Sequence, residues 1–171
     1  DVQAGGLLFS GGGSFSGTST LTGDVGLVGG AYTINNGASI GGTGRLVVVS
    51  GTNAITGNGP LGNLAITGGT VDFGAAVTLT SLSNSGGGLT GAGDVTITDS
   101  FVWTGGTMSG TGKTIIAATA TGTITPTSYY LYLSRTLENA GQTTLNASPS
   151  GYVIEVGVYG SGSGTISNLA G

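Results

Sequence analysis

One short unit recurs along this 171-residue chain and restricts the folds that are open to it. The unit consists of an apolar residue, a small polar residue, Gly, any residue and Gly, followed by a β-rich run. It is complete at Leu89 (LTGAG) and at Met108 (MSGTG), and copies or near copies begin at Leu21, Ile40, Ile55 and Tyr159. A unit that returns at short intervals indicates an architecture of stacked structural repeats.

The spacing of the copies predicts the length of one coil. The intervals between start points from Leu21 to Met108 are similar, except that the interval from Ile55 to Leu89 is about twice as long as the others. If that interval holds two coils, the mean is about 17 residues, and we expect coils of about 17–19 residues. The runs Val71–Phe73 and Val77–Leu79 alternate apolar and polar residues, as half-buried strands do.

These patterns predict an all-β fold: a single-domain parallel β-helix, or β-solenoid. No segment carries a helical stripe of useful length. Apolar residues are expected inside the coils, Thr and Ser outside, and Gly and Asn at the corners. Residues 1–125 form the Gly/Thr-rich coils, and residues 126–171 form a Tyr-rich portion of the same domain, either final coils or a β cap. Longer strands are predicted there, over Tyr129–Leu133 and Tyr152–Tyr159.

Composition excludes several classes of function. The chain has 38 Gly, yet its hydrophobic fraction of 37% and charged fraction of 6% are unlike those of a disordered segment. With only three Lys and Arg residues in total, it lacks the basic footprint that nucleic-acid binding needs. Cys and His are both absent, so we expect no disulfide, no metal site and no cofactor. The uncharged stretch Thr114–Ser134 contains Pro126 and is rich in Thr, so we expect no membrane insertion.

The acidic residues offer one candidate for catalysis. Asp94, Asp99 and Lys113 form the only plausible cluster for a polysaccharide lyase or hydrolase on a β-helix. The alternative, which we favour, is that both aspartates cap backbone N–H groups at turns. The run Gly91–Asp94 is similar to a calcium-binding repeat but lacks one residue between Gly and Asp. We therefore expect a protein that is not an enzyme.

Aromatic residues in the second half suggest a surface for glycans or a partner. Trp103, Tyr129, Tyr130 and Tyr132 could stack on sugar rings, and Tyr130 and Tyr132 share one strand face. The interpretation that we favour is that one strand face fills the core and the other forms a cross-strand ladder, because aromatic residues of strands mostly pack.

Two runs resemble a known family. They are Trp103–Gly112 (WTGGTMSGTG) and Leu133–Gly141 (LSRTLENAG), and both are similar to repeats of large bacterial cell-surface adhesins of the haemagglutinin-like and autotransporter-passenger-like kinds. The resemblance implies a β-helical stalk outside the cell. Its motifs are structural, so it implies no catalytic residue.

Apolar residues near both ends of the chain suggest a surface for end-to-end stacking: Leu7, Leu8, Phe9, Ile166 and Leu169. A solenoid needs polar caps to stay soluble, and neither end is polar. We expect the ends to stack on more of a longer polypeptide or head to tail on another copy. The sequence thus predicts an extracellular, cell-surface structural protein, either a stalk or a self-stacking filament subunit. The alternatives are a carbohydrate-binding adhesin domain and the lyase or hydrolase.

Overall fold

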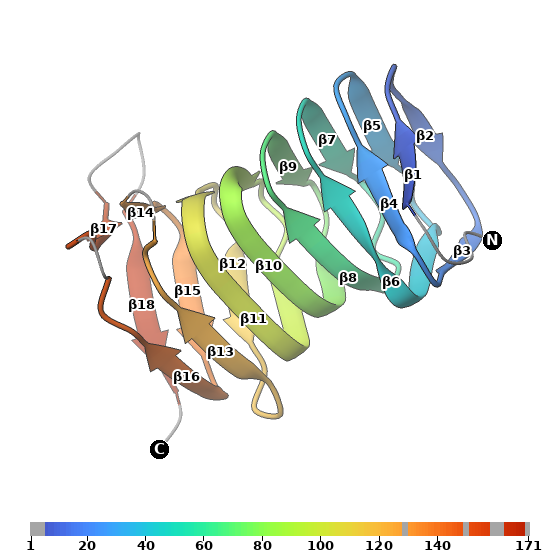
Figure 1. Ribbon diagram of the computed structural model, residues 1–171. Helices are drawn as coiled ribbons and strands as arrows, with labels where there is room; N and C mark the ends of the chain where they lie inside the picture. The colour runs from blue at the N-terminus through green and yellow to red at the C-terminus, as the bar shows by residue number, and fades with distance from the viewer. Residues whose placement is uncertain (1–5, 128–129, 149–150, 158–162, 170–171) are drawn as a thin grey trace.

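The computed structural model describes residues 6–127, 130–148, 151–157 and 163–169, and they form one 18-stranded sheet wound into a solenoid (Figure 1). The first coils hold β1 (Gly6–Phe9), β2 (Gly13–Phe15), β3 (Thr18–Leu21), β4 (Asp24–Leu27), β5 (Ala31–Ile34) and β6 (Ser39–Val48). The middle coils hold β7 (Thr52–Ile55), β8 (Leu61–Ile66), β9 (Thr70–Phe73), β10 (Val77–Thr90), β11 (Val95–Met108) and β12 (Lys113–Ile116). The last coils hold β13 (Thr121–Ile124), β14 (Leu131–Leu133), β15 (Thr136–Asn139), β16 (Gln142–Leu145), β17 (Ile154–Val156) and β18 (Thr165–Asn168).

The predicted parallel β-solenoid is confirmed. The chain makes about 8 turns, and each described strand pairs in parallel with the strand that lies one turn further along. Each turn has three faces, so the first turn consists of β1, β2 and β3 and the last of β16, β17 and β18. The two ends of the chain lie at opposite ends of the stack (Figure 1).

The register shows that the coils differ in length. Gly6 pairs with Asp24, and Thr18 pairs with Ser39. The stretch of chain between the two paired residues is longer in the second pair. Coils shorten again in the middle of the stack, where Thr52 pairs with Thr70, and are longest at the C-terminal end, where Thr136 pairs with Thr165. Each three-sided turn has three corners, and copies of the recurrent unit lie at two of them. The distance along the chain between two copies therefore equals a whole number of coils only when both copies lie at the same corner. The copy at Tyr159 lies outside the described residues.

The core is built from rows of apolar side chains that stack along the solenoid axis. One row runs through the first face from Val25 through Leu46 and Leu64 to Leu82, and all four side chains are buried. Alternation decides which residues face inward. In β9, Val71 and Phe73 are fully buried while Asp72 between them is exposed. Inward apolar and outward polar positions therefore follow the prediction.

The glycines of the recurrent unit form the corners. An added Cβ on Gly112 would collide with the backbone of Gly93 one coil below, and one on Gly110 would collide with Gly91. Gly110 also has a φ of 91°, which disfavours any residue with a side chain. The unit recurs because the coils approach each other most closely at these corners.

The C-terminal portion continues the solenoid as its last two coils. The prediction of longer strands there is wrong, because β14 and β17 have three residues each, whereas β10 and β11 have 14. Both long strands bend around corners at register shifts instead of stopping. The stretch Thr114–Ser134 contains strands, and the described residues include no helix of the length and apolarity needed to cross a membrane.

Candidate functional site: the two ends of the solenoid

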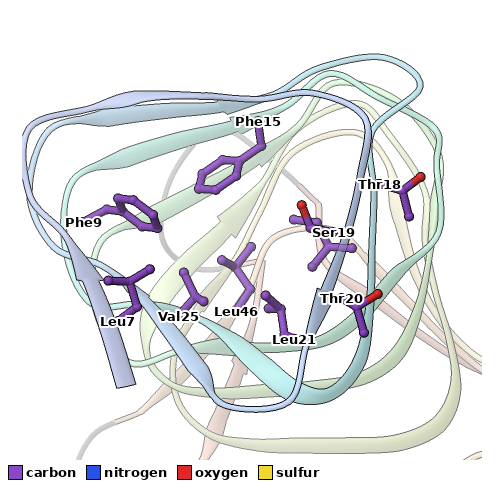
Figure 2. Close-up of a pocket in the computed structure, with 10 residues that line it drawn as sticks. Leu7, Phe9, Phe15, Thr18, Ser19, Thr20, Leu21, Val25 and Leu46 are labelled. Carbon is purple, nitrogen blue, oxygen red and sulfur yellow. The ribbon is translucent and has the colours of Figure 1, made fainter. Parts of the chain in front are cut away.

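The first turn leaves the apolar interior open at the N-terminal end of the stack. Leu7, Phe9 and Phe15 project into the space that β1, β2 and β3 enclose, above Val25 and Leu46 of the next coils (Figure 2). The resulting hollow has a volume of about 710 Å³. Its wall continues the core rows, since Leu7 pairs with Val25 and Val25 with Leu46. This end therefore exposes the cross-section of the core.

Aromatic contacts stabilise the first turn but leave its apolar side chains exposed. The rings of Phe9 and Phe15 meet edge to face with centroids 5.8 Å apart, and Phe15 lies 6.3 Å from the ring of Tyr32. Such pairs add about 0.5–1.5 kcal/mol beyond their burial. Leu7 and Phe9 nevertheless stay 41% and 37% exposed, and Leu8 on the outer face is 70% exposed.

The last turn presents a second apolar hollow at the other end of the stack. It has a volume of about 500 Å³ and is lined in part by Leu145, Val156 and Ile166. Leu145 is 64% exposed and Ile166 50% exposed, although each continues a row that is buried in earlier coils. The predicted end residues Leu7, Leu8, Phe9, Ile166 and Leu169 are thus all exposed, at the two ends of the solenoid. The sequence did not single out Leu145 and Val156, because the local pattern does not show that their strands belong to the last described turn.

The predicted aromatic surface is only partly exposed. Trp103 is fully buried in the row between Asn84 and Ile124, and its indole N–H donates to the carbonyl oxygen of Gly105 at 3.0 Å. Its assignment to a glycan or partner surface is therefore wrong. Trp103 occupies an inward position of β11, where its size fills the core.

Three tyrosines gather on the outside of the last two coils. Tyr130 is 39% exposed, and its ring centroid lies 6.4 Å from that of Tyr132 and 5.6 Å from that of Tyr152. The ring planes are inclined by 44° and 81°, so the rings pack on one another and do not make one flat platform. Leu131 and Leu133 point inward, as predicted for the other strand face. Tyr129 lies outside the described residues.

The acidic residues connect neighbouring coils. The Asp94 carboxylate accepts the backbone N–H of Lys113 at 2.7 Å, and the Lys113 ammonium donates to Glu138 at 2.9 Å. The side chain of Glu138 holds the pKa of Lys113 above its ordinary value. The predicted capping role is confirmed for Asp94, whose partner N–H belongs to the next coil instead of its own turn. Asp99 is exposed.

A second acid–base pair occurs near the N-terminal end. The guanidinium of Arg45 donates to both carboxylate oxygens of Asp24, at 3.2 and 2.6 Å, and the backbone N–H of Arg45 donates to the same group. The side-chain hydrogen bond from Arg45 lowers the pKa of Asp24 below its ordinary value of 3.8. Asp24 and Asp94 thus make the same contact: the carboxylate of each accepts the backbone N–H of a cationic residue in the next coil.

Arg135 is a buried charged residue to which the sequence analysis gave no role. It is 1% exposed, and its guanidinium donates to the carbonyl oxygens of Ser109, Gly93 and Lys113, on two earlier coils. Burial lowers its pKa to about 10, so it is charged at neutral pH, and the charge of Asp94 partly opposes this shift. The signal was present in the sequence, because Ser134–Arg135 replaces the Gly-x-Gly corner in this coil.

All three cations of the chain are therefore engaged in contacts between coils. Within the described ranges, no three residues of the kinds His, Cys, Asp or Glu lie close enough together to hold a metal ion. Comparison of the chain with protein-family models, with curated proteins and with solved structures gave no match.

Proposed function

We propose that this protein is a non-enzymatic structural component of the cell surface or extracellular space, either a stalk or a self-stacking filament subunit. One observation carries the proposal: both end turns leave the apolar core uncovered, whereas the turns between them bury it. Exposed strand edges and apolar rows attract further strands. The resemblance to repeats of bacterial surface adhesins agrees with a role outside the cell.

Electron microscopy of the purified chain, before and after dilution, tests this function. Strands of adjacent coils lie about 4.8 Å apart, so stacked copies of about 8 turns would give an axial repeat of roughly 38 Å. Thin fibres with that repeat support the filament, and dispersed short rods support the stalk. Irregular aggregates without an axial repeat would contradict both forms of the proposal.

The charged groups of the candidate catalytic cluster are bound to other residues of the protein, which supports a role without catalysis. Asp94 and Lys113, two members of the only acidic cluster considered for catalysis, are bound to groups of neighbouring coils. We expect no cleavage when the chain is incubated with a panel of acidic and neutral polysaccharides. Cleavage that Asp94→Asn abolishes while the fold is retained would assign a lyase or hydrolase instead.

A carbohydrate-binding adhesin domain is the second candidate. The exposed side chain of Tyr130 favours it, and the inclination of its ring to those of Tyr132 and Tyr152 counts against it. The test is binding to an array of glycans by the natural chain and by Tyr130→Ala. Binding that the substitution reduces at least tenfold would support this candidate. Absence of binding by either protein would remove this candidate, and equal binding by both would place the glycan site away from Tyr130.

A further inference from the structure

We propose that the last turn of one molecule docks on the first turn of a second copy and continues the described core rows in register. This inference rests on the proposed self-stacking function and specifies its contact. The three strands of the last turn, β16, β17 and β18, have four, three and four residues. The three strands of the first turn, β1, β2 and β3, have the same lengths in the same order.

Strand direction favours head-to-tail contact over head-to-head contact. All described strand pairs are parallel, so the free edge of the last turn has the polarity that a further coil would extend. The first turn of a second copy is such a coil. The contact joins two different surfaces, and repetition of such a contact builds a fibre unless it closes into a ring.

Of the two inward rows on the first face, one would match apolar residues, and the other would place Thr143 over Leu7. Leu145 ends the row that begins at Phe9 and passes through Leu27 and Val48, so docking places Leu145 over Phe9 of the next copy. Both side chains are exposed in the single chain, at 64% and 37%. Contact between them would restore the burial that the same row has in the interior.

The second and third faces would match by size and polarity. Val156 ends the row that begins at Gly13, so its branched side chain would meet a residue without one. Asn168 ends the row that begins at Ser19, so a polar residue would meet a polar residue. Asn168 already accepts a hydrogen bond from Asn139 one coil below at 2.8 Å, and docking would add a further polar residue to this row.

Charge does not oppose the contact. Residues 6–21 contain no ionisable side chain, and Glu155 is the only charged residue between 142 and 169. Repulsion between like charges is a main defence of exposed strand edges, and it is missing here at both edges. A second copy of the chain therefore fits the open core better than a charged partner would.

Engineered disulfides test the register, because the natural chain has no cysteine. Leu8 and Thr144 belong to one outward row on the first face, so docking would bring them to adjacent strands. The separation of adjacent strands, about 4.8 Å, lies in the Cα–Cα range that a disulfide spans. We expect the double variant Leu8→Cys/Thr144→Cys to form a ladder of covalent multimers on mild oxidation, and reduction should reverse it.

Two controls identify other arrangements. The pair Leu8→Cys/Ser167→Cys places the second thiol on the third face, so its cross-linking would indicate a copy rotated by one face and would overturn the register. Leu8→Cys alone would give covalent dimers only if first turns met head to head, which would also overturn it.

Microscopy of the same samples separates the two proposals. Fibres without a Leu8/Thr144 cross-link would retain the filament function and overturn the register. Monomeric rods at high concentration, with no cross-link, would overturn both the register and self-stacking. The occupant of the open core would then be further coils of a longer polypeptide.

Discussion

At the residue scale, corner glycines and corner charges connect neighbouring coils of this solenoid. Gly112 lies directly over Gly93, and Asp24 and Asp94 each accept the backbone N–H of a cation one coil on. The coils touch most closely at these corners, so a change of one atom there acts on two coils at once. Glycines with open space around them, such as Gly41, do not have this constraint.

A methyl group on a corner glycine should destabilise the protein. In Gly112→Ala the added Cβ collides with the backbone of Gly93, so we expect a loss of about 1–3 kcal/mol, the usual cost of overpacking. The matched control is Gly41→Ala in β6, where nothing lies within 4 Å of the new Cβ and no loss is expected. Urea unfolding of the three proteins measures the difference. Equal midpoints would contradict the role given to Gly112.

The pair of Asp24 and Arg45 predicts a pH dependence. Because the folded state lowers the pKa of Asp24, the pair stabilises the fold fully above about pH 3.8, and this contribution is lost as pH falls through the folded-state pKa. The pair is largely exposed, so its value is about 0.2–1 kcal/mol. We expect Asp24→Asn to be less stable than the natural chain at pH 6, and the difference should shrink as pH falls through the folded-state pKa of Asp24. A difference in urea titrations that stays constant or grows as the pH is lowered from 6 would refute this.

At the scale of the element, each strand depends on the rows that cross it. β11 bends around corners and contributes Phe101 and Trp103 to the core. Phe101 stacks on Gly122 of β13, so a large residue in one coil is matched by the smallest in the next. In a stacked repeat protein such contacts reach only the neighbouring coils.

Truncation of Trp103 should therefore loosen a limited part of the solenoid. We expect Trp103→Ala to cost about 3–5 kcal/mol, because it leaves a cavity in a row that is otherwise filled. Amide exchange should accelerate mainly in β10, β11 and β13, which flank the cavity. Tyr130→Ala, at a half-exposed position outside the core, is the control and should cost less than about 1 kcal/mol. Uniform acceleration along the whole chain would contradict this nearest-neighbour behaviour.

For the whole molecule, the ends differ from the flanks in what they leave uncovered. The flanks present outward Thr and Ser and scattered apolar residues such as Val49, which is 40% exposed at a corner. The ends present the core itself, with Leu145 at one of them. Assembly should therefore respond to changes at the ends and tolerate changes on the flanks.

A charge at the last turn should prevent stacking. Leu145→Lys changes a side chain that is already 64% exposed, so the single chain should fold, but docking would bury an ammonium against Phe9 of the next copy. We expect no fibres at concentrations where the natural chain forms them, by microscopy and sedimentation. Val49→Lys adds the same charge on a flank and should leave fibres unchanged. Fibres of Leu145→Lys would show that the last turn does not make the contact.

The sequence by itself determined the architecture and the inward and outward alternation. Strand periodicity and corner glycines are local properties, readable at Val71–Phe73 and at Gly110–Gly112, because both follow from how one residue sits on its neighbours. The sequence alone also showed that the end residues Leu7 to Phe9 are apolar, because this is a property of each residue by itself.

Only the tertiary structure decided which residues meet. Trp103 was predicted to lie on the surface and is buried. Arg135 was given no role and donates to three carbonyl oxygens. Leu145 was not predicted to lie at the open end, where it is exposed. Coil length varies along the stack, and the recurrent unit marks two corners, so its spacing along the chain does not give the register. Burial at each position depends on the coils above and below it, and that stacking is set by hydrogen bonds between segments far apart in sequence.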